Sequence, residues 1–504
     1  MRKFLIPLAL LILPASALAD GPVVRPAVGQ TSVGMPAPRP QTLQQEVEAL
    51  LAGAPQGTRF GLLVVDEQGR VVVSVNADQR FIPASNTKMF TTAAAYALLW
   101  NMDKPDVMAG TQVALVQGKG RQGPDAVLIG RGDARMSSAP DCEVNCLAQL
   151  ADAVAAKTDR VHDVVGDDSH WPDQRWVPGM SWNNIGTDSG TAVSALNLDD
   201  NELLIRVTPT AEGKPPFLEI GDYFEVVNEA VTAPAGSKTA LFVERPVNGN
   251  RLRVYGSIAA DSKGWSDRIG IDDPAHYTAW VFRKMLIARG VKVTGKVRVV
   301  HRAPDELDRA VPDMALAKAA DDREGVIMSL TPPPLAEDVV RINKDSQNVH
   351  AQVLFRRLGD IEGSGSEEWA AQALNGLFEK AGIPRSGYDF SDGSGMSTYN
   401  RISPRAAVLL LRWIDGQPWG AAWYASLPVA GKDGTLRRRF IGTPLEGKLF
   451  AKTGTLNATN TLSGTFTTRS GRRFTFAFLA NDVPNGTSVL WLMEAVLVRI
   501  AMAN

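Results

Sequence analysis

The stretch "PASNTKMFTTAAAYALL", residues 83–99, sets a serine three positions before a lysine at the start of an otherwise apolar segment. If a helix begins at Ser85, then Ser85 and Lys88 lie on one face at its N-terminus. A serine hydroxyl becomes a nucleophile when a base removes its proton, and a lysine with a lowered pKa is such a base. The stretch therefore predicts an activated serine, while an N-cap serine followed by a solvated lysine is the structural alternative.

Two later triplets carry groups that such a serine needs. Ser346-Gln347-Asn348 stands just before a predicted helix and supplies a second hydroxyl and an amide. Lys452-Thr453-Gly454 closes a predicted strand and supplies a second cation, a hydroxyl and a residue without a side chain. Each triplet alone is compatible with a helix cap or a strand end, but the three motifs in this order seldom arise together by chance. We expect them to surround one cleft.

The two ends of the chain predict the sheet that carries these motifs. Near the start, apolar residues recur at helical spacing over 43–51, and two strand-like runs follow around a turn at 67–69. The far end has an apolar helix over 489–502, preceded by three strand-like runs at 447–454, 461–468 and 472–481. We expect both ends to form one sheet, with the middle of the chain as an excursion.

The remaining segments differ in character from these ends. Residues 106–312 contain short strand-like runs separated by Gly, Pro, Asn and Asp, which predicts inserted, mostly β material. Residues 1–19 have a basic start, an apolar run and a small-residue cleavage pattern, and therefore predict a secretory signal peptide. Residues 20–40 hold five prolines and predict an extended linker.

Composition limits the partners and cofactors to expect. The 504-residue chain has a formal net charge of −1 at pH 7, so nothing in it indicates a binder of phosphate backbones, and no nucleic-acid partner is expected. Its five histidines are scattered, and none stands at a zinc-type spacing from Cys142 or Cys146, so no metal or other cofactor is expected. In an exported chain, a disulfide between the two cysteines is a better interpretation than a metal site, and the sequence leaves open whether that disulfide forms.

The three motifs in this order resemble those of the serine acyl-enzymes that bind penicillin, which carry Ser-x-x-Lys, Ser-x-Asn and Lys-Thr-Gly around one cleft. Ser346 follows Ser85 by 261 positions. That separation is similar to the class C low-molecular-mass penicillin-binding proteins, the D-alanyl-D-alanine carboxypeptidase/endopeptidase family of the penicillin-binding protein 4 type. Three flanking stretches resemble signatures of the same family: "PGMSWNNIGTDSGTAVSALNLDDN" (178–201), "DGSGMSTYNRISP" (392–404) and "LPVAGKDGTLRRRF" (427–440).

The resemblance implies a fold and its division into domains. It implies an α/β (α+β) serine β-lactamase/transpeptidase-like domain, with an antiparallel sheet flanked by helices, split between residues 41–105 and 313–504. Two mostly β domains are then inserted into it. Domain II covers residues 106–196 and 256–312, and domain III covers residues 197–255.

The same resemblance implies roles for the first two motifs. Ser85 is then the nucleophile and Lys88 its base, and the pKa of Lys88 is depressed by the nearby Lys452. Ser346 relays a proton toward the nitrogen of the leaving D-alanine. Asn348 holds the peptide amide of the substrate.

The third motif completes the implied cleft. Lys452 and Thr453 face the terminal carboxylate of the substrate. Gly454 lets the substrate lie along the strand as an added edge. The backbone N–H groups of Thr455 and Ser85 form the oxyanion hole.

Three positions outside the motifs are implied to face the rest of the substrate. Asp167, or its neighbour Asp168, matches an aspartate that reaches the cleft from domain II. Thr398 and Asn457 stand where the family often has arginine and glutamine. These departures leave the preferred side chain of the stem peptide open.

The resemblance implies an exported, periplasmic serine-type D-Ala-D-Ala carboxypeptidase and endopeptidase. Its substrates would be the stem peptides and cross-links of peptidoglycan, cleaved through an acyl-enzyme on Ser85, and β-lactam antibiotics would be covalent inhibitors. A serine β-lactamase is one alternative, although no glutamate base of the class A kind is evident. A non-catalytic scaffold that binds peptidoglycan is another. Peripheral membrane association and a homodimer are left open.

Overall fold

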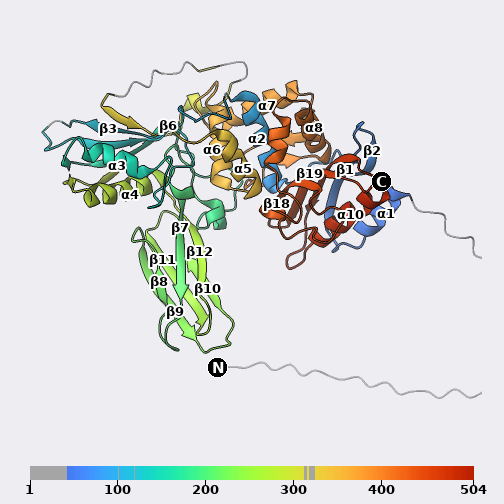
Figure 1. The fold of residues 1–504 in the computed structure, drawn as a ribbon, viewed down its shortest axis with the longest axis horizontal. Coiled ribbons are helices and arrows are strands. Elements are labelled where there is room, and N and C mark those ends of the chain that lie inside the picture. Colours follow the sequence, from blue (N-terminus) through green and yellow to red (C-terminus); the bar gives the residue numbers. More distant parts are fainter. Residues whose placement is uncertain (1–41, 100, 119, 312–314, 317–323) are drawn as a thin grey trace, which may run out of the picture. The chain divides into compact units, whose positions relative to one another are not determined.

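The computed structural model describes residues 42–504 except 100, 119, 312–314 and 317–323 (Figure 1). The expected signal peptide and linker, and the expected domain boundary at 312–313, lie outside the described residues. Among the described residues, no helix combines the length and the apolar character needed to cross a bilayer.

One antiparallel sheet is built from both ends of the chain, as predicted. Figure 1 shows N-terminal strands in blue beside C-terminal strands in red, and β1 pairs with β20 so that Leu62 lies opposite Phe478. The strand order is β18-β19-β20-β1-β2. The strands are β1 (Arg59–Val65), β2 (Val71–Val75), β18 (Leu449–Leu456), β19 (Thr459–Thr467) and β20 (Arg473–Asn481).

Helices cover both faces of this sheet because its central strands are apolar on both sides. Leu62 and Phe478 pack with α1 (Leu43–Leu51) and α10 (Leu490–Ala503). Their neighbours Leu63 and Leu479 point the other way and pack with a second group of helices. That group includes α2 (Thr87–Leu98), α6 (Asn348–Gly359), α7 (Glu367–Lys380), α8 (Pro404–Asp415) and α9 (Gly420–Ala425), with the short pair β16 (Tyr388–Asp389) and β17 (Arg401–Ile402) beside them.

The expected helix start at Ser85 is wrong in detail. Ala84–Asn86 form a separate 3-10 turn, η1, and α2 begins at Thr87. Tertiary hydrogen bonds hold this turn against the sheet, because the Asn86 side chain donates to the carbonyl of Lys452 (2.8 Å) and the Thr461 hydroxyl donates to that of Pro83 (2.9 Å). These partners are remote in sequence, so local pattern did not reveal the turn.

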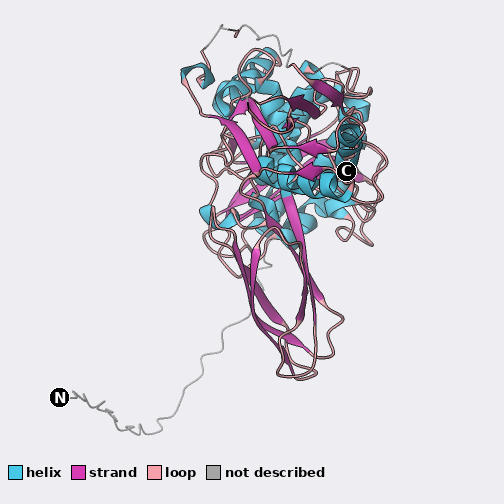
Figure 2. Cartoon of the chain, turned by 90° about the vertical axis from the view of Figure 1, so that its left-hand side faces the viewer, coloured by secondary structure: helices cyan, strands magenta, loops and turns pink. Residues whose placement is uncertain are grey.

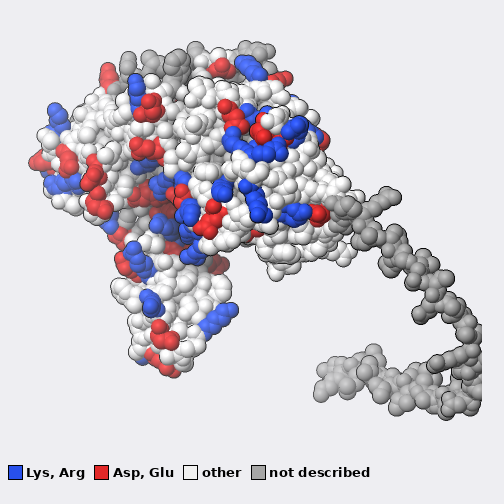
Figure 3. Space-filling view, turned by 45° about the vertical axis from the view of Figure 1, so that its right-hand side comes forward, with Lys and Arg blue, Asp and Glu red and all other residues white. Residues whose placement is uncertain are grey.

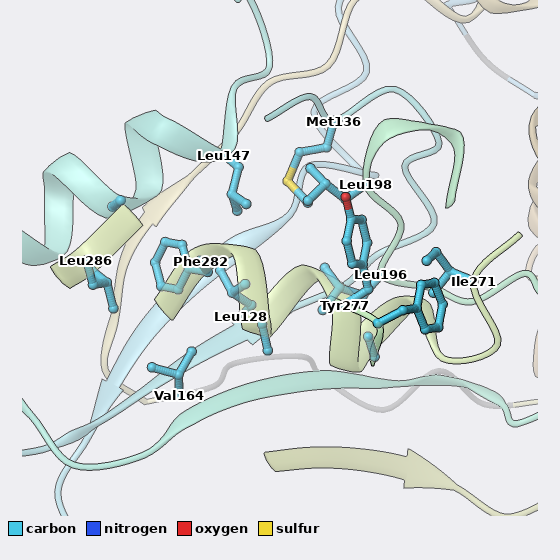
Figure 4. Packing of buried hydrophobic residues seen from close by; sticks show 14 of the residues in the cluster. Leu128, Met136, Leu147, Val164, Leu196, Leu198, Ile271, Tyr277, Phe282 and Leu286 are labelled. Carbon is cyan, nitrogen blue, oxygen red and sulfur yellow. The ribbon is translucent and has the colours of Figure 1, made fainter. Parts of the chain in front are cut away.

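The first inserted sheet is a mixed sheet with helices packed on it, in the order β14-β6-β4-β3-β15. Figure 4 shows Leu147, Phe282 and Leu286 from these helices gathered over Leu128 and Val164 of the strands. The strand-like runs did not predict these helices. The elements are β3 (Gln112–Val116), β4 (Asp125–Ile129), β6 (Val164–Pro172), β14 (Val297–Arg302), β15 (Val326–Ser329), α3 (Leu147–Ala155) and α4 (Pro274–Ala288), with the short parallel pair β5 (Arg160–Val161) and β13 (Lys292–Val293).

The second inserted part consists of strands and loops, drawn in magenta and pink in Figure 2. It contains two three-stranded sheets, β10-β11-β9 and β12-β7-β8. The strands are β7 (Glu202–Thr208), β8 (Phe217–Glu219), β9 (Glu225–Ala233), β10 (Ala240–Glu244), β11 (Arg251–Ala259) and β12 (Trp265–Gly270). Since β12 pairs with β7, this sheet extends past the expected boundary at residue 255.

Two local features bear on the sequence expectations. Cys142 and Cys146 are joined in a disulfide just before α3. On the face drawn in Figure 3, Lys and Arg side chains are interspersed with Asp and Glu, and uncharged surface separates the small groups of charge. The face therefore carries mixed charge, in keeping with the small net charge of the chain.

A buried ionic cluster joins the helix that begins at Asn348 to the inserted part. His350 on α6 is fully buried, its Nε2 lies 2.8 Å from Asp200 Oδ1, and its Nδ1 bonds Asp338 on α5 (Leu335–Lys344). Burial by itself disfavours the charged ring, but the carboxylates of Asp338 and Asp200 outweigh it and raise the pKa of His350 to about 9. The cluster therefore stabilises the fold while His350 is protonated.

We expect this stabilisation to fade in mildly alkaline solution. Because the folded-state pKa of His350 lies above the unfolded value of about 6.5, the contribution is complete below pH ~6.5 and is lost as the pH rises toward about 9. The melting temperature of His350→Gln should thus lie below that of the wild type at pH 6, and the gap should narrow by pH 9. His162→Gln serves as the control. A gap that does not change with pH would show that His350 contributes by packing alone.

Candidate active site

The three predicted motifs meet at one cleft of about 560 Å³. Of the sequence-predicted site residues, eight line it: Ser85, Ser346, Asn348, Thr398, Thr453, Gly454, Thr455 and Asn457. Lys88 and Lys452 are fully buried behind this lining. The remaining lining residues are Ile82, Ser181, Asn184, Ser189, Asp345, Met396, Thr435 and Leu456.

Lys88 lies in the first turn of α2 with its amine directed at Ser85. The distance from Lys88 Nζ to Ser85 Oγ is 3.0 Å. Nζ also lies 2.6 Å from Asn348 Oδ1 and 2.5 Å from the carbonyl oxygen of Ser394. An amide oxygen and a backbone carbonyl can only accept hydrogen bonds. A neutral amine gives these two acceptors its two hydrogens, and its lone pair is then left for the proton of Ser85.

Burial makes this neutral amine available near physiological pH. It lowers the pKa of Lys88 from 10.5 to about 7, and the carboxylate of Asp392 opposes the shift. Burial also lowers the pKa of Lys452, and the charge of Lys88 lowers it further. The expectation that the charge of Lys452 depresses the pKa of Lys88 is therefore corrected, because burial causes that shift. The two amines are coupled in the other direction: once Lys88 carries a proton, its charge disfavours protonation of Lys452.

Lys452 serves the other side of the cleft. Its Nζ donates to Ser346 Oγ (2.9 Å) and to the carbonyl of Thr453 (3.0 Å). The Thr453 hydroxyl donates to Thr435 Oγ1 (2.7 Å), a residue that the motif search did not single out. Ser346 has a φ of +64°, a conformation that is uncommon outside glycine and that recurs at functional sites. These groups place hydroxyls and an amine where a carboxylate can bind.

Position 454 requires a glycine for a different reason from the one expected, namely the close approach of η1. A Cβ at this position would lie 2.9 Å from Ser85 N, 2.9 Å from the carbonyl oxygen of Pro83 and 2.2 Å from Thr461 Oγ1. The glycine therefore lets η1 approach β18 closely and fixes the backbone of Ser85 beside the strand. β18 is an edge strand of the sheet, and residues 428–430 pair with its outer edge only at residues 449–451. The part from Thr453 onward can still accept an extended peptide.

Asn348 is held at both ends of its amide. Oδ1 accepts from Lys88 Nζ, and Nδ2 donates to the carbonyl of Ser189 in the inserted part (2.8 Å). The residue thus orients Lys88 and ties the cleft to the 188–190 turn. A substrate carbonyl that binds Nδ2 shares or displaces the bond to Ser189.

Asp167 is not brought to the cleft. Its carboxylate accepts from the backbone N–H and hydroxyl of Ser169, and neither Asp167 nor Asp168 is among the lining residues. Asp168 instead bonds Ser194 (2.8 Å) and His301 (2.8 Å). These aspartates are engaged within the first inserted sheet and its surroundings, and the expected contact of Asp167 with substrate stays a prediction.

The third partner of Lys88 is a backbone carbonyl that the sequence did not reveal. It lies in a turn capped by Asp392, which accepts from the N–H groups of Gly395 (2.9 Å), Met396 (2.9 Å) and Ser397 (3.1 Å). This capped turn aims the Ser394 carbonyl at Lys88. A backbone acceptor leaves no residue-type signal in the sequence.

The sheet from both chain ends, with an activated serine beside its edge strand, defines a serine acyl-transfer enzyme of the penicillin-binding type. Residues 43–502 match the D-Ala-D-Ala carboxypeptidase 3 (S13) family, and the chain belongs to that family. The predicted resemblance is confirmed.

Individual relatives agree with this assignment. The chain is 32% identical over 515 residues to a D-alanyl-D-alanine carboxypeptidase of Actinomadura sp. (strain R39), covering 97% of this chain and 88% of that protein. It is 24% identical over 469 residues to the D-alanyl-D-alanine carboxypeptidase DacB of Haemophilus influenzae, covering 90% and 91%. The crystal structure of penicillin binding protein 4 (dacB) from Haemophilus influenzae has the same fold, with a TM-score of 0.73, 22% identity and coverage of 90% and 97%.

The protonation of Lys88 predicts a pH profile. Acylation by a fluorescent penicillin should rise with pH and reach half its plateau rate near pH 7, because the base must be neutral. Lys452→Met should keep this midpoint within about half a unit, since a methionine keeps the site buried. Stopped-flow acylation rates over pH 5–9 measure both. An upward shift of the midpoint by one pH unit or more in Lys452→Met would show that the charge of Lys452 lowers the pKa of Lys88.

Proposed function

We propose that the protein is an exported, periplasmic serine D-Ala-D-Ala carboxypeptidase that also cleaves the related D-alanyl bond of peptidoglycan cross-links. The observation that supports this best is the arrangement of Lys88, whose two obligate acceptors leave its lone pair for Ser85. The family assignment supports the substrate class, and the outer edge of β18 from Thr453 onward suits an extended peptide.

The proposed acylation uses groups already in contact. Lys88 takes the proton of Ser85, and Oγ attacks the carbonyl carbon of the penultimate D-alanine. The N–H of Ser85, which η1 holds beside β18, and that of Thr455 face the developing oxyanion. The C–N bond then breaks, and the proton passes by way of Ser346 to the leaving nitrogen. Water completes the cycle by cleaving the ester, with Lys88 again as the base.

Carboxypeptidase and endopeptidase cleavage require the same chemistry and differ in the leaving group. A free D-alanine ends in a carboxylate, which Lys452, Thr453 and Thr435 can bind. A cross-link offers a longer leaving group that needs space beyond them. The cleft has a volume of about 560 Å³, which supports the wider substrate range. Penicillins are proposed to acylate the same serine.

The first test removes the nucleophile. Ser85→Ala should lose covalent penicillin labelling and D-alanine release, each by at least about a thousandfold, because no other group can form the ester. Intact-protein mass after penicillin exposure and a D-alanine assay measure the two effects, with Ser181→Ala at the cleft rim as the matched control. A penicillin adduct on Ser85→Ala would refute the assignment, and a labelled wild type that releases no D-alanine would favour a scaffold.

The cleft predicts weak charge selection at the side chain of the stem peptide. Asp345 is the one ionisable residue in its described lining, and the Thr398 hydroxyl already donates to the carbonyl of Gly179 (2.8 Å). Thr398→Arg should favour a stem peptide with a carboxylate at its third residue over one with an amine. The ratio of the two kcat/KM values should change by the equivalent of up to about 2 kcal/mol. Thr398→Gln, which adds length without charge, is the control. Strong discrimination by the wild type would mean that another residue reads this position.

A further inference from the structure

A second cavity of about 560 Å³ lies outside the catalytic cleft, and we call it the side cavity. Three separate parts of the chain form it: the segment after β6, the turn between β10 and β11, and the first position of α7. None of its residues belongs to the three motifs. The lining is Asp173, Gln174, Arg175, Trp176, Pro178, Asn248 and Glu367.

A small third cavity of about 20 Å³ lies between the side cavity and the catalytic cleft. It shares Arg175 and Trp176 with the side cavity, and it shares Ser189, Asn348 and Met396 with the cleft. A volume of this size holds about one water molecule. The side cavity is thus a neighbour of the catalytic cleft, separated from it by a wall that includes Trp176.

The side cavity presents no unpaired charge at neutral pH. Arg175 is already paired with Asp173, with a distance of 2.8 Å between Nε and Oδ1. Glu367 is 7% exposed, and burial raises its pKa to about 8 against the opposing charge of Arg356, so its carboxyl keeps a proton. An ionic ligand would therefore lack a counter-charge, and the cavity suits an uncharged one.

The polar groups that remain can bind hydroxyl and amide oxygens. Trp176 Nε1 has no hydrogen-bond partner among the described residues, but its surface is closed to solvent, so it is not among the polar groups that face the cavity. The protonated carboxyl of Glu367 can donate as well as accept, and its contact to Gln352 is long, at 3.4 Å. Asn248 adds an amide, and the indole of Trp176 adds a flat apolar face. A ring with hydroxyl and acetamido groups matches this set.

We propose that the side cavity binds an N-acetylated amino sugar of the glycan backbone that carries the stem peptides. This inference rests on the proposed function, because the glycan is attached to the same substrate. A stem peptide in the catalytic cleft must lead to a sugar outside it, and the side cavity has the volume typical of ligand sites, roughly 300–1,000 Å³. Binding there would hold the polymer while the peptide is cleaved.

The test uses a peptide-free trimer of N-acetylglucosamine and full-length protein whose Ser85 has been acylated by penicillin. Titration calorimetry or ligand-observed NMR should detect binding, because the side cavity stays open when the cleft is filled. Trp176→Leu, which removes the flat aromatic face, and Asn248→Gly, which keeps the backbone at its φ of +57°, should each weaken binding about three- to tenfold. The exposed Trp491 gives the matched control Trp491→Leu.

Two results would overturn the proposal. One is binding that disappears on acylation, which would place the sugar in the catalytic cleft. The other is no binding, or binding that neither variant changes.

Enzyme assays separate this proposal from the proposed function. Asn248→Gly should raise KM for a disaccharide pentapeptide and leave D-alanine release from a glycan-free pentapeptide unchanged. An equal effect on both substrates would contradict a glycan site. Failure of the wild type to cleave the glycan-free peptide would instead refute the proposed function, while the calorimetric result would still decide whether the sugar binds.

Discussion

A buried lysine amine held by two acceptors that cannot donate is the interaction on which the active site depends. Transfer of a lysine out of water disfavours its charged form, and Asn348 Oδ1 and the Ser394 carbonyl then fix the direction of the neutral amine. The lone pair can face only Ser85. Without both acceptors, the amine would rotate, and the serine would lose its base.

The rest of the fold supplies the surroundings that this lysine requires. α2 is buried among α6, α7 and the sheet, which removes Lys88 from solvent. Asn348 begins α6, and the ionic cluster around His350 ties that helix to the inserted part. The turn capped by Asp392 provides the second acceptor. The inserted segments therefore support the catalytic geometry as well as adding surface.

Sequence alone was sufficient where a pattern repeats or where side-chain type carries the chemistry. Strand-like apolar runs predicted β1 and β20, and the three motifs predicted which segments meet at the cleft. The sequence was insufficient for features that depend on contacts between distant parts of the chain. These features are the 3-10 turn at Ser85, the close approach that requires Gly454, and the backbone acceptor at Ser394. The contact of Asp167 with substrate rests on resemblance at one position and stays a prediction.

The most direct test of this account is the protonation state of Lys88 in the free enzyme. NMR of side-chain-labelled lysines, compared between the wild type and Lys88→Met, assigns the signal of this residue and gives its titration curve. The account predicts that this signal titrates near pH 7, since burial lowers the pKa of Lys88 to about 7. A Lys88 signal that titrates near the ordinary lysine value of about 10.4 would contradict it, because the amine would then be charged and could not accept the proton of Ser85.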